Sequence, residues 1–350
     1  MNPISYGRQS ITEEDIRAVI ETLQSDYLTQ GPKIKAFENA FARYVEAGYA
    51  VAVNNGTAAL HLAAIALGVK PGDRVIVTPL TFAASANCIR YCGGEVFFCD
   101  IDQETYLMDI DKLEKLLSDH PKGYFKGIVP VDFAGYPIEA ERFRRLADAY
   151  GLWILEDACH APGAYYIDGK GGKQFAGNGK YADAAVYSFH PVKHITTGEG
   201  GMITTDSKEI YEKMLLYRTH GITKDPAKMH RNDGGWYMEM QELGYNYRIT
   251  DFQAALGLTQ LAKADWGLER RNEIARKYNE AFASCAGIKT PFVAANIYHA
   301  FHLYVIQVED RLGLYNYLRE QQIYAQVHYA PLHLMPYYQS LGSQKGDCPV

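Results

Sequence analysis

In AAVYSFHPVKHITTGEGGMITT, residues 184–205, two strand-like runs enclose a lysine and a glycine turn, and the fold assignment begins from this pattern. Residues 184–188 and 201–205 are short runs of the kind that form buried strands. Between them lie Lys193 and a glycine turn at residues 198–201. A lysine sheltered beside buried strands loses hydration, which lowers the pKa of its ammonium and leaves an amine able to attack an aldehyde. An isolated lysine would instead be an ordinary solvated surface charge, so Lys193 has to be judged with its surroundings.

Outward from this stretch, apolar strands alternate with helices. Strands that are continuously apolar and separated by helices predict a mostly parallel sheet covered on both faces, which is an α/β fold. Further strands are expected at residues 50–53, 74–78, 95–99, 127–131 and 152–155, and helices at residues 11–24, 35–44, 58–67, 85–91, 113–117 and 139–150.

The last hundred residues follow a different pattern. Helices are expected at 251–261, 269–283 and 311–321 and a strand at 299–308, which indicates a smaller α+β domain. We therefore expect a large domain with the N-terminal segment over residues 1–250 and a small C-terminal domain over 251–350. Two polar segments are expected as loops: residues 25–33, with a Gly-Pro stop, and the mobile glycine-rich run 169–180.

Composition narrows the class of protein. The chain has 350 residues, 47% of them hydrophobic, and a net charge of −6. A negative balance argues against nucleic acid as the main partner. The N-terminus has no signal-peptide pattern and no run of about 18 apolar residues predicts a membrane span, so a cytoplasmic enzyme is expected.

The cysteines and histidines do not form a metal-binding pattern. The six cysteines show no CxxC pair, and the spacing of Cys88 and Cys92 fits free thiols better than a metal site. His190 and His194 also have a spacing that a metal could use, but no third ligand is evident. We predict no metal, and free thiols fit a reducing cytoplasm.

Two side chains near the lysine complete a coherent set. Asp157 ends the apolar run WILED, and a carboxylate at the edge of a buried strand needs a cation or several donors. Ser188 lies five residues before Lys193. An amine, an acid and a hydroxyl are the groups that hold pyridoxal 5'-phosphate (PLP): an imine to the aldehyde, a partner for the ring nitrogen, and a phosphate ligand.

Two further motifs follow predicted strands. NNGTAALH, residues 54–61, opens a helix, so Gly56 allows close approach while the Thr57 hydroxyl and Ala58 amide can donate to an anion. An ordinary helix cap is the alternative. Phe82, at the ligand-binding edge of the sheet, could stack on a heteroaromatic ring, or it could be core packing. His160 could bond near the ring's phenolic oxygen, or it could simply begin a helix.

Together these segments resemble the DegT/DnrJ/StrS family of PLP-dependent sugar aminotransferases, which have the fold type I, aspartate aminotransferase-like architecture. The resemblance covers nearly the whole chain. It is carried by LTQGPK, NNGTAALH, TPLTFAASAN, PVDFAGYP, EDACHAPGA, SFHPVKHITTGEGGMITT, LGYNYRITDFQAALG and QVHYAPLH. Family members usually continue beyond the point that matches Val350, so the small domain is expected to be incomplete.

The resemblance implies roles for individual residues. Lys193 matches the Schiff-base lysine, Asp157 the acid at the pyridine nitrogen, Phe82 the stacking aromatic and His160 the position beside the ring oxygen, where many relatives have glutamine. Phosphate ligands are matched by Thr57, Ala58, Ser188 and, from the partner subunit of a homodimer, Asn246. Segments lining the sugar-nucleotide pocket are matched by Tyr6, by Asp26, Tyr27, Leu28 and Thr29, and by Gln326, Val327, His328 and Tyr329.

The resemblance also implies the reaction. Within the family, SFHPVKHITTGEGG and AQVHYAPLH are most similar to the pseudaminic acid pathway enzyme. We therefore expect amination of UDP-2-acetamido-2,6-dideoxy-β-L-arabino-hex-4-ulose with L-glutamate as donor. The alternatives are an aminotransferase for another nucleotide-linked keto-sugar and a non-catalytic PLP-binding protein.

Overall fold

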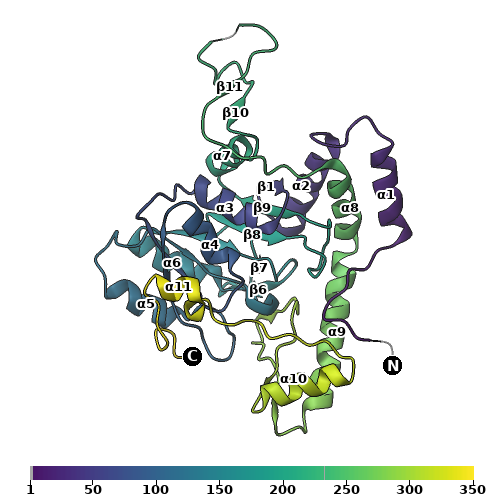
Figure 1. The fold of residues 1–350 in the computed structure, drawn as a ribbon, viewed down its shortest axis with the longest axis vertical. Coiled ribbons are helices and arrows are strands. Elements are labelled where there is room, and N and C mark those ends of the chain that lie inside the picture. Colours follow the sequence, from purple (N-terminus) through teal and green to yellow (C-terminus); the bar gives the residue numbers. More distant parts are fainter. Residues whose placement is uncertain (1–2, 232) are drawn as a thin grey trace.

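The computed structural model describes residues 3–231 and 233–350, and its centre is a seven-stranded sheet (Figure 1). The strand order is β1-β9-β8-β5-β4-β2-β3, and only β9 runs antiparallel to its neighbours. The predicted α/β class with a mostly parallel sheet is confirmed. The strands of this sheet are β1 (Tyr49–Val53), β2 (Arg74–Val77), β3 (Glu95–Phe98), β4 (Gly127–Val129), β5 (Trp153–Asp157), β8 (Ala184–Ser188) and β9 (Gly201–Thr205).

Helices cover this sheet and extend from it. They are α1 (Glu13–Leu23), α2 (Pro32–Val45), α3 (Gly56–Ala66), α4 (Ala84–Tyr91), α5 (Ile110–Ser118), α6 (Ala140–Tyr150), α7 (Lys208–Arg218), α8 (Asp251–Ala262), α9 (Ala264–Phe282), α10 (Arg311–Glu320) and the short α11 (Pro336–Ser340). The helices overlap the predicted ranges, because amphipathic spacing and capping residues mark them in the sequence, except for α7 and α11, which no predicted range covers.

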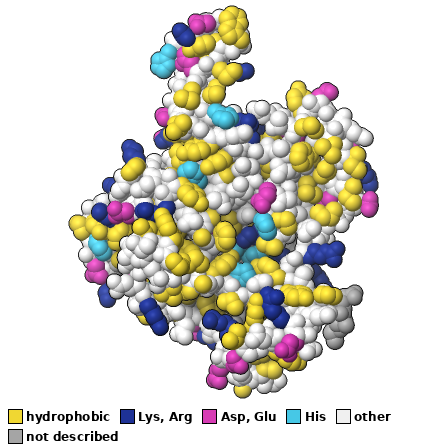
Figure 2. Space-filling model, viewed as in Figure 1, with side chains coloured by type: hydrophobic (Ala, Val, Ile, Leu, Met, Phe, Trp, Pro, Cys, Tyr) yellow, Lys and Arg dark blue, Asp and Glu magenta, His cyan; other side chains and the backbone are white. Residues whose placement is uncertain are grey.

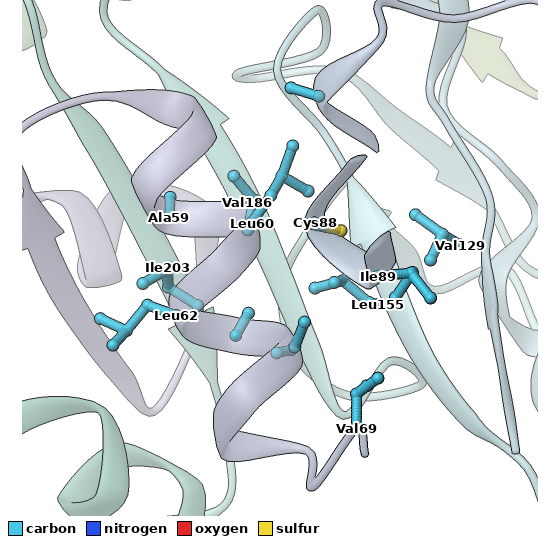
Figure 3. Close-up of a cluster of buried hydrophobic side chains, with 14 of the residues drawn as sticks. Ala59, Leu60, Leu62, Val69, Cys88, Ile89, Val129, Leu155, Val186 and Ile203 are labelled. Atoms are coloured by element: carbon cyan, nitrogen blue, oxygen red, sulfur yellow. The ribbon is translucent and has the colours of Figure 1, made fainter. Parts of the chain in front are cut away.

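Helix α3 shows why the sheet is buried on this face. Leu60 and Leu62 on α3 pack against Leu155, Val186 and the rest of an apolar cluster from β4, β5, β8 and β9 (Figure 3). Each fully buried aliphatic side chain of this size contributes roughly 1.5–3 kcal/mol by leaving water. This packing fixes the N-terminus of α3 at the edge of the sheet where the parallel strands end.

Three local predictions are wrong. Pro32 begins α2 as its first residue instead of stopping the chain, since proline lacks only an amide that helix starts leave unpaired. Residues 299–308 are not one strand: strand character is confined to β13 (Ile297–Tyr298) and β14 (Gln307–Val308). The glycine-rich run 169–180 contains β7 (Lys173–Phe175), which pairs with β6 (Tyr165–Ile167).

The C-terminal hundred residues lie in two places. Helix α9 leads away from the sheet to α10 and to the small sheet of β14 with β12 (Ile288–Lys289) (Figure 1). The chain then returns, and Leu332 and Tyr338 join the core cluster under α3 and α4. The domain division at residue 250 stays a prediction.

A long hairpin projects from the opposite end of the molecule. Its strands are β10 (Ile222–Thr223) and β11 (Glu239–Met240), and Figure 1 shows it extending away from the sheet body. Trp236, Met240 and Leu243 on this hairpin are exposed. The arm therefore presents apolar side chains to its surroundings.

Candidate functional site

A cavity of about 770 Å³ lies at the edge where β1, β2, β4, β5 and β8 end. This is the edge at which open α/β sheets bind ligands. Figure 2 shows histidine side chains gathered near the centre of this face. The predicted site residues that line the cavity are Tyr6, Gly56, Thr57, Ala58, Phe82, Asp157, His160, Ser188, Lys193, His328 and Tyr329.

Lys193 is a partly buried side chain of the cavity wall, so the alternative of a solvated surface charge does not hold. Its backbone amide donates to His190 O at 2.8 Å, which closes the turn after β8. Burial lowers the pKa of the Lys193 ammonium, while the nearby Cys159 and Asp157 oppose that change. The amine therefore reaches its neutral, nucleophilic form at a lower pH than an ordinary lysine.

Asp157 is a buried carboxylate at the end of β5. It accepts a 2.6 Å hydrogen bond from Ser85 Oγ and a 3.2 Å bond from the Cys159 amide. Within residues 3–231 and 233–350 it forms no ion pair, so two neutral donors carry its charge. A carboxylate held in this way is suited to a cationic ligand in the cavity.

The start of α3 faces the cavity as an anion site. A Cβ added at Gly56 would lie 2.9 Å from Ser188 Cβ, so only glycine allows this approach. The Ala58 amide already donates to the side chain of Asn55 at 2.8 Å, so it is not a free donor in this structure. The ordinary helix cap, which was the alternative, is thus present. The other amides of the first turn of α3 and the hydroxyls of Thr57 and Ser188 are left to bind an anion.

Phe82 and His160 differ sharply in exposure. The Phe82 side chain is 61% exposed, which excludes the alternative of core packing. His160 is buried, and its Nδ1 accepts from the Ala134 amide at 3.3 Å. Burial lowers the pKa of His160 well below its usual range, and the charge of Lys193 adds to this effect. The His160 ring is therefore neutral, with its Nε2 side 3.5 Å from the Tyr329 hydroxyl.

The N-terminal and C-terminal segments meet at one wall of the cavity. The Tyr6 hydroxyl lies 2.9 Å from His328 Nε2, and the two rings stack with centroids 5.1 Å apart. The Ile4–Ile323 bridge holds the two segments together. Residues more than 320 positions apart in the sequence thus form one surface.

Several predicted residues do not line this cavity. Asn246 is exposed and pairs with Thr219 in an isolated bridge. The other predicted site residues that lie outside the cavity are all exposed, and they are Asp26, Tyr27, Leu28, Thr29, Gln326 and Val327. Their predicted roles stay predictions.

Other cavity residues were not found by sequence reasoning. His302 is buried against His160, with ring centroids 4.3 Å apart, and it lines the cavity. His61 and Tyr247 also line the cavity and are joined by a 2.9 Å hydrogen bond between Nδ1 and the hydroxyl. Ser85 supports the site from behind, through its bond to Asp157, and does not itself line the cavity. The contacts of His302 depend on tertiary packing alone.

This sheet with its lysine, buried acid and anion site defines a PLP-dependent aminotransferase of fold type I. The donor set fits the cofactor: Lys193 offers the amine, Asp157 an acid without a cation, and Gly56 with Ser188 a close approach for phosphate. Residues 9–350 match the DegT/DnrJ/EryC1/StrS aminotransferase family, and the chain belongs to it. It is a sugar aminotransferase of that family, with PLP as cofactor.

Named relatives cover almost the whole chain. The spore coat polysaccharide biosynthesis protein SpsC of Bacillus subtilis is 40% identical over 99% of this chain and 88% of its own length. The UDP-4-amino-4,6-dideoxy-N-acetyl-beta-L-altrosamine transaminase of Campylobacter jejuni is 38% identical over 97% and 86%. Helicobacter pylori PseC, an aminotransferase involved in pseudoaminic acid biosynthesis, superposes with a TM-score of 0.87 at 31% identity, over 98% and 89%.

The membrane prediction can be compared with the helices directly. Among the residues that the structure describes, no helix is both long enough and apolar enough to cross a membrane.

Proposed function

We propose that the chain transfers the amino group of L-glutamate to UDP-2-acetamido-2,6-dideoxy-β-L-arabino-hex-4-ulose, in pseudaminic acid biosynthesis. The observation that carries the chemistry is one arrangement: Lys193 lies in the same cavity as the buried acid Asp157 and the anion site at Gly56. The names of the Campylobacter and Helicobacter relatives support the choice of substrate.

PLP, when bound, supplies an electron sink that makes the α-hydrogen of the amino donor acidic. The chain's own residues supply the rest. Lys193 anchors the cofactor through its amine and, once released, moves the proton at the donor's α-carbon. Burial favours the neutral amine that both tasks need. Asp157 holds a positive charge at the ring nitrogen, and Ser85 keeps Asp157 oriented.

The remaining roles follow the same arrangement. Phe82 offers an exposed ring for stacking, and neutral His160 faces the ring oxygen. Thr57, Ala58 and Ser188 would hold the phosphate, which requires the Ala58 amide to exchange its bond to Asn55 for one to the phosphate. The residues proposed to contact the sugar nucleotide are Tyr6, Asp26, Tyr27, Leu28, Thr29, Gln326, Val327, His328 and Tyr329. We propose a homodimer in which the exposed Asn246 reaches the phosphate in the partner subunit's site, and a division into units at residue 250.

Reduction with borohydride followed by digestion tests the anchor. The wild type loaded with PLP should give a pyridoxyl adduct on the peptide of Lys193, and Lys193→Ala should give neither adduct nor turnover. Lys180→Ala is a matched control, because Lys180 is a partly exposed lysine paired with Glu46 at 3.7 Å. An adduct elsewhere on the wild type would refute the assignment.

Turnover assays with different keto-sugars test which substrate the enzyme uses. The UDP-linked 4-keto sugar should be aminated faster than TDP-linked or 3-keto analogues. SpsC is similar to this chain over as much of its length as the other relatives are, to within a few per cent, and this keeps a different nucleotide-linked keto-sugar as the second candidate. Formation of pyridoxamine phosphate with glutamate separates both from a protein that only binds PLP.

A further inference from the structure

Two buried carboxyl side chains lie behind the cavity, and the proposed reaction leaves them unused. Asp132 follows β4 and is 0% exposed, and Glu156 precedes Asp157 in β5 and is 2% exposed. Val131 pairs with Asp157 in a bridge between these neighbouring segments, and each of the two carboxyl groups influences the pKa of the other, so the two groups lie close together. The other contacts are backbone amides: Ile138 N donates to Asp132 Oδ1 at 2.7 Å, and Gly177 N to Glu156 Oε1 at 2.8 Å.

A hydrogen bond between two carboxyl groups requires a proton on one of them, because an ionised carboxylate only accepts. Asp132 Oδ2 is buried, and no group among the described residues donates to it. If Asp132 Oδ2 carries the proton itself, it can donate to the Glu156 carboxylate and is no longer without a partner. Burial raises the pKa of Asp132 well above its usual range, with repulsion from Glu156 adding to it. Burial also raises the pKa of Glu156, to about 7.

Among the residues that the structure describes, neither Asp132 nor Glu156 forms an ion pair with a cationic side chain. The titratable groups that face it are the carboxylate Asp157 beside it on β5, the thiol Cys159, and the phenols Tyr166 and Tyr187. All of these are acids, and two ionised carboxylates in such surroundings would repel each other strongly. A proton shared by Asp132 and Glu156 removes that repulsion, and it lowers the negative charge of the pair next to Asp157.

The pair also lies at the base of a turn that contacts the candidate site. Asp132 opens the tight turn Phe133–Gly135, in which Ala134 has φ 59°. The Ala134 amide donates to Nδ1 of His160. Because Nδ1 accepts, the neutral ring carries its proton on Nε2, on the side that faces Tyr329 and the cavity.

We propose that Asp132 and Glu156 share one proton and act as a positioning pair. The pair fixes the turn so that the Ala134 amide keeps His160 in its Nε2–H tautomer, a hydrogen-bond donor toward the cavity. The role of that donor in the reaction rests on the proposed function. The proton sharing and the tautomer do not, since both belong to the cofactor-free chain.

Infrared spectroscopy of the cofactor-free protein at pH 6 tests the shared proton. The wild type should show a protonated-carboxyl C=O band that is lost in Asp132→Asn and in Glu156→Gln, since an amide can donate to the remaining carboxylate without a proton. Asp251→Asn is the control: Asp251 is also fully buried, but it accepts two backbone amides, from Gly31 and Lys33. Its variant should keep the band, and a band unchanged in all three variants would overturn the proposal.

Nitrogen-15 NMR of histidine-labelled, cofactor-free protein tests the positioning. His160→Gln assigns the signals of His160. Asp132→Asn should preserve the Nε2–H pattern because its amide still bridges Glu156, whereas Asp132→Ala should lose it. An alanine variant that folds, by circular dichroism, and keeps the same His160 signals would show that the pair has no positioning role. If the infrared and NMR results are as expected but the wild type does not turn over the keto-sugar, only the proposed function is contradicted.

Discussion

The hydroxyl of Ser85, on α4, donates a 2.6 Å hydrogen bond to Oδ2 of Asp157, at the end of β5. Ser85 is itself fully buried and lies 2.8 Å from the Thr81 hydroxyl. The contact joins the motif after β2 to the acid at the end of β5. These two strands are distant in sequence, and β4 alone separates them in the sheet. It makes Ser85 part of the support of the candidate site.

Ser85→Ala should weaken binding of PLP. A hydrogen bond to a charged group contributes about 1.5–3 kcal/mol, so the dissociation constant should rise roughly 10- to 100-fold. Absorbance titration of the cofactor-free protein measures it. Ser25→Ala removes a serine hydroxyl that bonds the backbone of Thr22 and Tyr27, neither of which lines the cavity, and it should leave the constant unchanged. Equal constants for wild type and Ser85→Ala would show that the contact does not support the cofactor.

Gly56→Ala should damage the anion site. The new Cβ would lie 2.9 Å from Ser188 Cβ and 3.1 Å from Ser188 Oγ, and overpacking of this kind costs about 1–3 kcal/mol. We expect weaker PLP binding together with a lower Tm. Gly267, in α9, has open space where its Cβ would be, so Gly267→Ala should be neutral or stabilising. Retention of full cofactor affinity by Gly56→Ala would contradict the phosphate assignment.

Phe82→Ala separates stacking from packing. The side chain is 61% exposed, so its removal should change the free energy of unfolding of the cofactor-free protein by less than about 0.5 kcal/mol. Stacking contributes about 0.5–1.5 kcal/mol beyond area burial, so the affinity for PLP should fall several-fold. Phe82→Tyr should restore it. A large loss of stability without a change in affinity would indicate a structural role instead.

Much of this site could be predicted from the sequence, for a physical reason. Strands, glycine turns and helix starts are local patterns, so the positions of Lys193, Asp157 and Gly56 at one sheet edge follow from alternation and from the rule that parallel strands end together. The lining of the cavity by Tyr6 and His328 came only from the family resemblance, because no local pattern brings the two chain ends together.

The wrong strand prediction and the contacts that were not predicted share one cause. Residues 299–308 alternate and are rich in β-formers, yet His299 bonds its own segment through the Phe301 amide at 2.8 Å, and Ala300 and Leu303 donate to the turn 134–135. Tertiary contacts there replace a strand ladder. The partners of Asp132 are invisible to the sequence for the same reason.

Acid sensitivity should come partly from His299. Burial lowers the pKa of this ring from 6.5 to about 3, so below pH 6.5 the unfolded chain takes up a proton that the folded chain refuses. The unfolded state then binds more protons, and the free energy of unfolding falls as pH falls from about 6.5 toward 3, by up to about 1.4 kcal/mol per pH unit.

His299→Asn, whose side-chain oxygen can accept from the Phe301 amide in place of Nδ1, should flatten this dependence. His230, an exposed histidine paired with Glu239, provides the control variant His230→Asn. Urea unfolding of the cofactor-free protein between pH 4 and 7 measures the slopes, and identical slopes for wild type and His299→Asn would show that the buried ring is not a source of the acid sensitivity.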